Sequence, residues 1–396
     1  MQIERVETLI IGGGQAGLVM SHRLKQRGVS HVVLERRRVA ERWRSERWDG
    51  LKFQFPNWSV RLPDFPFPHT DPDAFATTDE IIKFIDAYAA FVAPPIRCGV
   101  EVARLRRRDD ASGFIAETAD GAIEADNVVV ATGPYQRALV PDLLRDHPVF
   151  QVHASNYQNP RQLPSGAQIA EELQRTGRRV YLSVGTHRRL PRRYRGRDLI
   201  WWLAEMGIDQ TTTAQRGASA LGPVISGAYG GQTIDFRRYA ADGMMLTGHL
   251  RSARGGVIEI APGLAESLVA GDLVFTTFLD IVDGYVKLRG LDLPDEPEAR
   301  TTLPDPACVT EPLQHLDVGA SGIGAVIWAT GYGLDFGWID IPMKDANGDP
   351  LHRNGITDVP GLYFLGLPWL SKMNSSFLSG VGDDAAVLAE HIAARR

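Results

Sequence analysis

The feature that most constrains the fold is a glycine-rich stretch near the start of the chain, residues 8–36, TLIIGGGQAGLVMSHRLKQRGVSHVVLER. It opens with a β-branched apolar run that predicts a strand buried on both faces, and Gly12, Gly14 and Gly17 follow in the GxGxxG spacing. The first glycine allows a tight turn, the second lets a pyrophosphate approach the backbone, and the third lets a helix pack closely on the strand. The stretch therefore predicts a βαβ unit that binds a dinucleotide.

The remainder of this unit indicates which dinucleotide it binds. A helix that begins at Gln15 and Ala16 directs its unpaired N–H groups at the phosphates, and Gly28 ends it. The second strand finishes at Glu35, whose carboxylate accepts hydrogen bonds from ribose hydroxyls and repels a 2′-phosphate. FAD or NAD is therefore expected rather than NADP, and the position of the unit ahead of a long chain favours FAD. The alternative is a glycine-rich turn that binds nothing.

Composition sets limits on the class of protein. The 396 residues are enough for two domains, and a net charge of −5 gives no general attraction to nucleic acid or to an anionic membrane. Because no run of about 18 apolar residues occurs and the first strand begins too early for a signal peptide, we expect a cytoplasmic protein. The two cysteines, Cys98 and Cys308, form no CxxC motif, which argues against a redox disulfide and a Cys/His metal site.

After Glu35 an irregular segment, residues 36–68, alternates arginines with tryptophans and is then interrupted by prolines. Such a segment must pack on something flat and partly charged, and a flavin ring with its phosphates suits it. Trp43, Arg44 and residues 54–58 are then expected to run past the ring. The alternative is a proline-rich surface loop whose aromatic side chains lie under the fold.

The following region predicts a helix and a small sheet. Residues 76–92 form an amphipathic helix with Thr78 as its N-cap. Three short strands, residues 100–105, 114–118 and 122–124, predict a β-meander. The run NVVVATG at 127–133 predicts a buried strand that ends in a glycine turn beside the FAD site, although a core strand with a simple turn has the same pattern.

Four motifs now occur in a recognisable order: GGGQAG, ATG at 131–133, HASNY at 153–157 and WATGY at 328–332. In this order they resemble the flavin-dependent monooxygenases with two dinucleotide-binding domains, and most of all their bacterial flavin-containing monooxygenase-like branch. The resemblance covers nearly the whole chain, including GLYFLGLPWL and GVGDDAAVLAEHI near the end. It implies an α/β fold with a Rossmann-like FAD-binding domain, residues 1–158 and 322–396, and a smaller inserted nicotinamide-nucleotide domain, residues 159–321.

The resemblance also implies site residues. The cofactor-binding positions it suggests are Gly12, Gly14, Gln15, Ala16, Gly17, Glu35, Arg36, Trp43, Arg44, Gln54, Val102, Ala131, Thr132, Gly133, Gly331, Gly382 and Asp383. Asn57 matches the position from which the family presents a side-chain amide to the flavin peroxide. Amides at residues 382–384, the start of the last helix, would stabilise negative charge on the reduced ring, although Asp383 and Asp384 also suit a plain helix cap.

The family fingerprint F-x-G-x-x-x-H-x-x-x-Y/F is only half present. His153 and Tyr157 match it, whereas His147 and Val149 stand where phenylalanine and glycine are expected. Tyr157 in place of tryptophan looks more like the N- and S-oxygenating branch than like the Baeyer–Villiger enzymes. A purely structural role for His153 and Tyr157 at the domain junction is the preferred alternative.

The main departure from the family is a missing phosphate loop. A strand and second GxGxxG should precede the helix of residues 167–173, but residues 161–166 lead directly into it, and the next strand follows at 179–184. A missing central strand leaves backbone groups unpaired, at about 1–3 kcal/mol each when buried. Three interpretations are open: residues are absent from the chain through disorder, with the numbering closed over the gap; the deletion is real and NADPH binding is lost; or residues 162–166 form a substitute loop. We favour the first, because the flanking pieces are intact.

The arginine-rich run HRRLPRRYRGRD, residues 187–198, follows the strand that normally meets the adenosine ribose. Arginine forms forked, charge-assisted hydrogen bonds with phosphate, so Thr186, Arg188 and Arg189 are candidates for the 2′-phosphate of NADPH. The alternative is a solvated basic loop. Further on we expect a helix from Trp201, a mobile loop at 217–231, a helix at 233–241, paired strands at 257–260 and 273–279, and a linker at 292–306.

By resemblance, NADPH reduces the FAD, oxygen adds to the ring, and the C4a-hydroperoxide transfers one oxygen atom to a small amine or sulfide. The expected partners are therefore a small-molecule substrate and O2, and a homodimer is compatible with the sequence. Two other classes remain open if the second glycine loop is truly absent. They are a nicotinamide-independent flavoprotein oxidase or dehydrogenase, and a non-catalytic FAD-binding protein.

Overall fold

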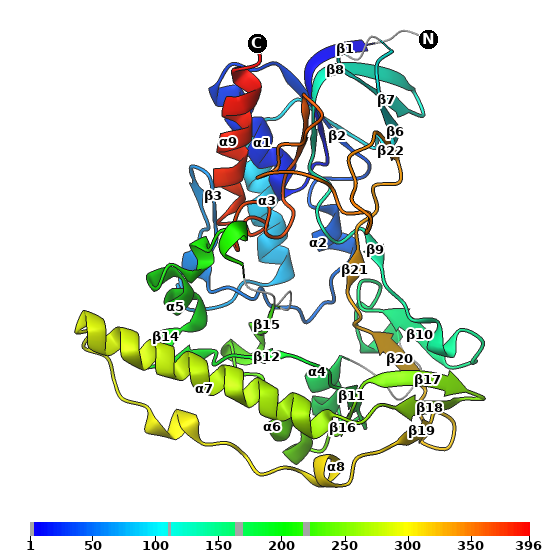
Figure 1. The fold of residues 1–396 in the computed structure, drawn as a ribbon, viewed down its shortest axis with the longest axis vertical. Coiled ribbons are helices and arrows are strands. Elements are labelled where there is room, and N and C mark those ends of the chain that lie inside the picture. Colours follow the sequence, from blue (N-terminus) through cyan, green and yellow to red (C-terminus); the bar gives the residue numbers. More distant parts are fainter. Residues whose placement is uncertain (1–3, 110–111, 163–168, 217–221) are drawn as a thin grey trace.

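The computed structural model describes residues 4–109, 112–162, 169–216 and 222–396. Figure 1 shows two lobes, an upper lobe that contains the regions near both termini and a lower lobe crossed by one long helix. Among the described residues no helix is long and apolar enough to cross a membrane. The arrangement agrees with the α/β fold of two nucleotide-binding lobes expected from the sequence.

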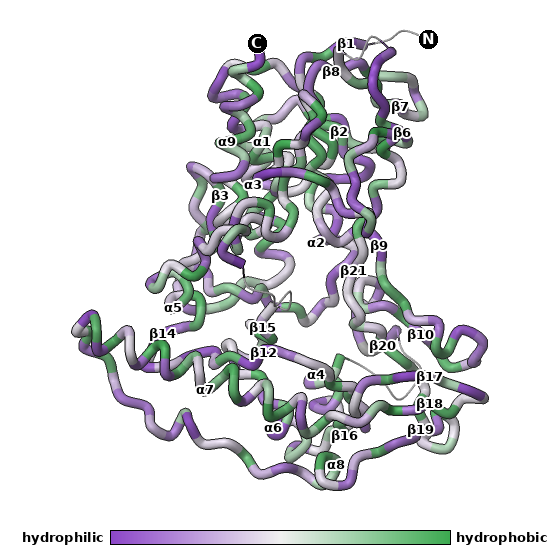
Figure 2. Tube along the Cα trace, viewed as in Figure 1, coloured by the Kyte–Doolittle hydropathy of each residue, from purple (hydrophilic) through white to green (hydrophobic). Residues whose placement is uncertain are grey.

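Parallel strands form the centre of the upper lobe. They are β1 (Glu4–Ile11), β2 (His31–Glu35), β5 (Ile96–Cys98), β8 (Gly121–Val130) and β23 (Leu362–Phe364). Within the sheet β1 lies between β2 and β8, with Ile11 opposite both Leu34 and Val130. Because parallel strands end at the same edge, the segments after Ile11, Glu35 and Val130 meet there. Figure 2 shows hydrophobic residues concentrated in this centre.

Three helices accompany the sheet: α1 (Gln15–Gln26), α3 (Thr78–Val92) and α9 (Val381–Ala393). The first of them contacts both of the others. The cap expected for α3 was wrong by one residue. Thr77 is the N-cap: its hydroxyl accepts from the N–H of Glu80 at 3.2 Å, and its own N–H donates to the Glu80 carboxylate at 2.7 Å. This reciprocal capping box fixes the start of the helix.

The β-meander is present, and its last strand is longer than expected. It consists of β6 (Val102–Arg107), β7 (Phe114–Thr118) and the first half of β8, and β7 is antiparallel to both of the others. The expected strands at 122–124 and 127–130 are a single strand, because one edge of β8 pairs with β1 along most of its length. The opposite edge pairs first with β7 and then with β23, and β22 (Ile339–Asp340) adds to the free side of β6.

Two connections cross between the lobes side by side. They contain β9 (Arg137–Ala138) and β21 (Tyr332–Gly333), which pair antiparallel. Beyond them β10 (Phe150–His153) pairs parallel with β20 (Ala325–Trp328). The latter strand packs through Trp328 with the sheet of β17 (Leu250–Arg254), β18 (Val257–Ile260) and β19 (His315–Asp317). The domain boundaries at 158–159 and 321–322 stay a prediction.

Besides β10 and β20, the described part of the lower lobe contains two short parallel strand pairs. These are β11 (Tyr181–Ser183) with β16 (Met245–Thr247), and β12 (Arg188–Arg189) with β15 (Pro223–Val224). In the part of the chain that the structure describes, no strand lies between β10 and α4 (Ala170–Arg175). The interpretation that residues are absent from the chain through disorder depends on the backbone between Ser165 and Ala167, which lies outside the described residues.

The strand expected at 273–279 was wrong. These residues belong to α7 (Leu264–Arg289), the long helix at the bottom of Figure 1. Its buried residues recur at helical spacing, for example Phe275, Leu279, Val282 and Val286. The β-branched and aromatic content of the segment favours a strand, but the three- and four-residue spacing of its buried positions indicates a helix.

The remaining elements of the described chain are short and lie in both lobes. They are α2 (Glu41–Ser45), α5 (Leu199–Glu205), α6 (Phe236–Ala241), α8 (Ala307–Thr310), the hairpin of β13 (Arg193–Tyr194) and β14 (Arg197–Asp198), the pair β3 (Arg61–Leu62) and β4 (Phe65–Pro66), and seven short 3-10 turns, η1 (Asn57–Ser59), η2 (Asp142–Leu144), η3 (Pro160–Gln162), η4 (Ile208–Gln210), η5 (Thr213–Gln215), η6 (Ala228–Gly230) and η7 (Pro297–Arg300).

Candidate functional site

The glycine loop after β1 has the geometry that its spacing predicted. Gly12 has φ = +116°, and a Cβ there would lie 2.5 Å from the carbonyl oxygen of Ala131. A Cβ on Gly17 would lie 1.9 Å from the carbonyl oxygen of Gly12. These two glycines are therefore required by close packing of the loop, the helix and the end of β8.

Gly14 differs from both, because a Cβ placed there would meet nothing within 4 Å. It caps α1, which has no side-chain cap and no acidic residue in its first turn. Among the described residues, no acceptor is found for the N–H groups of Gly14, Gln15 and Ala16. Free N–H groups at the positive end of a helix, beside an open position, fit the diphosphate of a dinucleotide.

Glu35 lies against this loop. Its carboxylate accepts from the N–H of Gly13 at 2.7 Å and from the N–H of Arg37 at 2.9 Å. A carboxylate has about four acceptor positions, so it keeps capacity for ribose hydroxyls. Arg36 is exposed and lies 3.9 Å from Glu101, and Val102 begins β6 just beyond, with its side chain buried.

The end of β8 and the crossing connections come together around Gln136. Its amide nitrogen donates to the Thr132 hydroxyl at 3.1 Å and to the carbonyl oxygen of Gly133 at 2.7 Å. The carbonyl oxygen of Gly331 accepts from Nε2 of His153 at 3.1 Å. His153 and the fully buried Tyr157 therefore have contacts that fit their structural role at the junction.

Aromatic contacts bring the segment after α2 to the start of α9. The rings of Phe55 and Phe377 lie 4.9 Å apart, and Trp43 packs on Phe53 at 5.7 Å. From α1, the amide of Gln15 donates to the carbonyl oxygen of Ser376 at 2.8 Å. The glycine loop, the 53–57 segment and the loop before α9 thus border one site.

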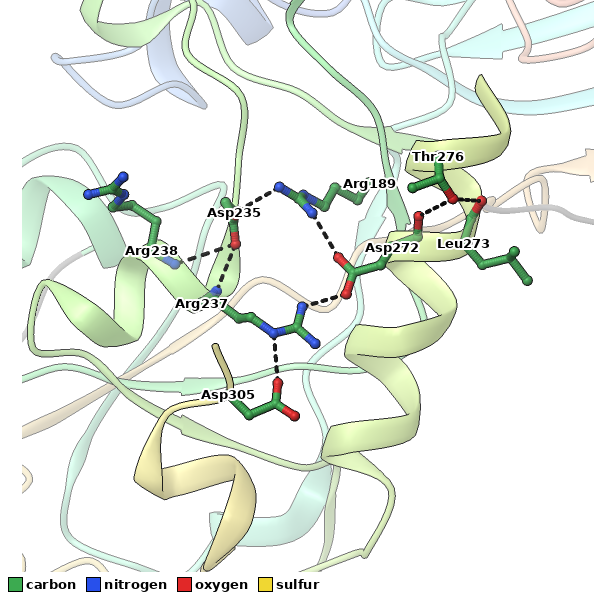
Figure 3. Close-up of polar contacts among 8 residues, drawn as sticks. All are labelled: Arg189, Asp235, Arg237, Arg238, Asp272, Leu273, Thr276 and Asp305. Atoms are coloured by element: carbon green, nitrogen blue, oxygen red, sulfur yellow. Dashed lines mark hydrogen bonds and ion pairs between the residues drawn. The ribbon is translucent and has the colours of Figure 1, made fainter. Parts of the chain in front are cut away.

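Two arginines expected to bind cofactors have carboxylate partners within the protein, and their cofactor contacts stay a prediction. Arg44 donates to both carboxylate oxygens of Asp86 in α3, at 2.6 and 2.5 Å. Arg189 lies between Asp235 and Asp272, at 2.5 and 2.7 Å, and Arg237 joins Asp272 to Asp305 (Figure 3).

The Arg189 guanidinium also lies over the ring of Phe275 at 4.3 Å, and the side chain is 8% exposed. Its charge is neutralised by these carboxylates within the lower lobe, which argues against a role at a 2′-phosphate. Of its neighbours, Thr186 is exposed and Arg188 is half-buried. No contact recorded among the described residues brings Thr186 or Arg189 to the glycine loop.

Asn57 is 9% exposed and begins a short 3-10 turn. Its amide nitrogen donates to the carbonyl oxygen of Asp71 at 3.0 Å, while its Oδ1 is buried with no hydrogen-bond partner among the described residues. A buried acceptor without a donor costs free energy, so this atom is a candidate for contact with a bound group.

The start of α9 contains two aspartates that the sequence offered as helix caps, and the structure gives them different environments. Asp383 pairs with Lys372 and is largely exposed, whereas Asp384 is 4% exposed and accepts from the Ser371 hydroxyl. Burial raises the pKa of the Asp384 carboxyl, and the like charge of Asp383 adds to this effect. Gly382 packs against Pro63. The DD pair in the sequence was the available signal, but burial decides which member is unusual.

Arg192 was missed in the sequence analysis, because it was one arginine in a basic run. It is 2% exposed and forms a forked pair with Asp198, with N–O distances of 2.9 and 3.1 Å. Its third nitrogen donates to the carbonyl oxygen of Gln54 at 2.7 Å. The guanidinium lies over the ring of Phe75 at 4.4 Å. Arg192 therefore links the lower lobe to the segment that leads to Asn57.

Comparison with known proteins identifies the group to which this chain belongs. The pyridine nucleotide-disulphide oxidoreductase family matches residues 9–190. The chain is 32% identical over 406 positions to an uncharacterized CzcO-like oxidoreductase of Geobacillus kaustophilus, covering 98% of each chain. Because 406 exceeds the 396 residues of this chain, the alignment includes positions at which only the relative has a residue.

Two further comparisons concern monooxygenases. A probable indole-3-pyruvate monooxygenase of Arabidopsis thaliana, YUCCA4, is 30% identical over 189 residues, which cover 46% of this chain and 45% of the relative. The flavin-containing monooxygenase of Stenotrophomonas maltophilia has the same fold, with a TM-score of 0.58, 18% identity and 99% of each chain covered. The chain therefore shares its fold with a flavin-containing monooxygenase and belongs to the family of the CzcO-like oxidoreductases.

Proposed function

We propose that this enzyme is an FAD-dependent monooxygenase that uses NADPH and O2 to oxygenate a small soft nucleophile, an amine or a sulfide. The observation that carries the proposal is the open position at Gly14 beside the unpaired N–H groups of α1. Similarity to a probable indole-3-pyruvate monooxygenase over nearly half of the chain supports oxygenation as the reaction class.

The glycine loop would hold the diphosphate of FAD. The N–H groups of Gly14, Gln15 and Ala16 would donate to phosphate oxygens, where the helix terminus adds favourable potential. Glu35 would accept from the ribose hydroxyls while its two backbone hydrogen bonds keep it beside the loop. Ala131, Thr132 and Gly133 border the same edge of the sheet.

When bound, the isoalloxazine ring would take two electrons from NADPH and pass them to O2, so that one oxygen atom enters the substrate and the other leaves as water. The buried Oδ1 of Asn57 would accept a hydrogen bond within the site. The ring pair Phe55 and Phe377 would keep water from this side. Burial raises the pKa of the Asp384 carboxyl, so this group would take up a proton more readily than an exposed aspartate.

A second candidate is a nicotinamide-independent flavoprotein oxidase or dehydrogenase. Two observations favour it: the described residues contain no strand between β10 and α4, and Arg189 is already paired with Asp235 and Asp272. The two candidates differ in the electron donor and not in the FAD site.

The test uses the FAD-loaded enzyme with thioanisole as a probe sulfide. We expect equal amounts of NADPH and O2 to be consumed and methyl phenyl sulfoxide to be formed. A flavin that dithionite bleaches but NADPH does not bleach contradicts the monooxygenase and leaves the second candidate. Consumption of NADPH with all the oxygen recovered as hydrogen peroxide, with amine and sulfide probes alike, contradicts the proposed oxygenation.

A further inference from the structure

A cavity of about 280 Å³ lies where the two lobes meet, on the side of the 54–58 segment. Its lining residues are Trp58, Asp73, Arg193, Gly196, Arg197, Asp198 and Trp201. We propose that this cavity binds an organic monocarboxylate with a flat apolar body. This step rests on the proposed function: the bound monocarboxylate is the substrate that the enzyme oxygenates.

One wall of the cavity is continuous with the turn that carries Asn57. The N–H of Trp58 donates to the carbonyl oxygen of Pro72 at 3.0 Å, and Asn57 donates to that of Asp71. The N–H of Asp73 in turn donates to the Asp71 carboxylate at 3.0 Å. Trp58 and Asp73 are therefore fixed relative to Asn57 by hydrogen bonds, so a ligand in the cavity lies next to this turn.

The other wall is the β13–β14 hairpin with the first turn of α5. Asp198 holds it in place, since its carboxylate accepts from the buried Arg192 and from the N–H of Ile200 at 2.8 Å. Arg192 also donates to the carbonyl oxygen of Gln54. Both walls are thus attached to the 54–58 segment, and the cavity does not depend on loosely held side chains for its position.

The charges around the cavity favour a single negative charge on the ligand. Arg192 neutralises Asp198, which leaves Arg193, Arg197 and Asp73. Within the described part of the chain, none of these three forms an ion pair within 4 Å. The net charge of these three side chains is one positive unit. A carboxylate ligand neutralises this charge, and guanidinium groups bind carboxylates through charge-assisted hydrogen bonds.

The remaining lining selects the apolar part. Trp58 and Trp201 are both half-buried, and the Arg197 guanidinium lies 5.0 Å from the ring centre of Trp201. Indole faces suit a flat ring held by offset stacking. A hole of about 150 Å³ accepts benzene, so the 280 Å³ here has room for one or two rings with a carboxylate but not for a dinucleotide.

The first experiment measures binding without turnover. The FAD-loaded enzyme is titrated by calorimetry, without NADPH, with (phenylthio)acetate and with its neutral isostere 2-(phenylthio)acetamide. We expect the acid to bind about tenfold more tightly than the amide, because only the acid pairs with the arginines. Equal affinities, or no binding of either probe, overturn the proposal.

Variants assign the effect to the cavity. Arg193→Gln and Arg197→Gln should each lower the affinity for the acid about three- to tenfold and leave the affinity for the amide unchanged. The change is modest because both side chains are partly in water. Asp73→Asn should raise the affinity for the acid, because it removes a negative charge that repels the ligand carboxylate. The matched control is Arg254→Gln, an exposed arginine of β17 outside the cavity, which should change neither affinity. Loss of acid binding in the control, with no change in the cavity variants, also overturns the proposal.

A second measurement separates this inference from the proposed function. Adding NADPH and air to the bound acid should yield (phenylsulfinyl)acetate. If the acid binds with the expected variant pattern but no sulfoxide forms, while thioanisole is also unchanged, the oxygenase assignment fails and the carboxylate site stands. If thioanisole is oxygenated but the acid does not bind, the oxygenase assignment stands and the carboxylate site fails.

Discussion

Arg192 of the lower lobe donates a hydrogen bond of 2.7 Å to the carbonyl oxygen of Gln54 in the upper lobe. Its two other guanidinium nitrogens donate to the carboxylate of Asp198. Two lobes joined by the crossing strands β9 and β21 are thereby held together at a second place. Gln54 belongs to the segment assigned to the proposed flavin site, and Asp198 lines the carboxylate cavity. The contact therefore fixes the relative position of the two sites.

Arg192→Met should lower the free energy of unfolding by about 3–5 kcal/mol, because it leaves Asp198 buried without its partner. Chemical denaturation of the FAD-loaded enzyme measures this. Asp198→Asn should have a similar effect, and the double variant should lose less than the sum of the two single losses. Additive losses show that the pair does not act as a unit. Arg193→Met, the exposed neighbour, should change stability by less than about 0.5 kcal/mol.

Gly14→Ala separates ligand binding from folding. The apoprotein should fold normally, because the added Cβ meets nothing within 4 Å and the backbone angles suit alanine. FAD should bind about tenfold or more weakly, since the Cβ interferes with the approach of the phosphates. Gly284→Ala, an equally open position in α7, is the control and should bind FAD as the natural chain does. Unchanged FAD affinity in Gly14→Ala contradicts the assignment of the loop.

Gly17→Ala should behave differently from Gly14→Ala. Its Cβ would lie 1.9 Å from the carbonyl oxygen of Gly12, a backbone atom that cannot move without displacing β1 or α1. We expect a lower melting temperature of the apoprotein itself, measured by circular dichroism. A variant as stable as the natural chain indicates that helix and loop pack less closely than the structure has them.

Asp384 should make stability depend on pH in a predictable direction. Burial raises its pKa in the folded protein above the ordinary aspartate value of about 3.9. The folded state therefore holds the proton more tightly than the unfolded chain does. The contribution of Asp384 is most favourable at low pH and declines as the pH rises from about 3.9 to the raised value.

The comparison with Asp384→Asn isolates this contribution. As the pH falls through that window, the natural chain should gain stability relative to the variant, as measured by urea denaturation at a series of pH values. A constant difference between the two proteins contradicts a buried, preferentially protonated carboxyl. Asp383→Asn is the matched control, because that carboxylate is largely exposed.

Arg189 should act on stability and not on the choice of nicotinamide. Arg189→Met leaves Asp235 and part of Asp272 without a partner in the network of Figure 3, so it should destabilise the enzyme by about 3–5 kcal/mol. The ratio of KM for NADPH to KM for NADH should stay the same. A large rise in that ratio with normal stability would show that Arg189 binds the 2′-phosphate.

The parts of the fold that sequence predicts well are those fixed by local spacing. Gly12 and Gly17 lie where turn geometry and close packing exclude a side chain, and both requirements can be read from the GxGxxG pattern. The prediction of a strand at residues 273–279 was wrong, because the β-branched and aromatic residues of this helical segment are typical of a strand over a short window. Only the spacing over the full length of α7 distinguishes the two.

The contacts of the site residues that could not be predicted from the sequence join distant segments. Arg189 meets Asp235 and Asp272, and Arg192 meets Gln54, across separations of 46, 83 and 138 residues. A basic run in the sequence cannot indicate which arginines are already neutralised. Burial likewise separates Asp384 from its neighbour Asp383, although the two are chemically identical.

The central claim is that the enzyme holds FAD in the glycine loop and reduces it with NADPH. The most direct measurement is the flavin absorbance of the purified holoenzyme after anaerobic mixing with NADPH. We expect the visible absorbance band of the oxidised flavin to be bleached by NADPH and restored by air. A colourless protein that FAD cannot reconstitute, or a band that NADPH leaves unchanged, would contradict the account.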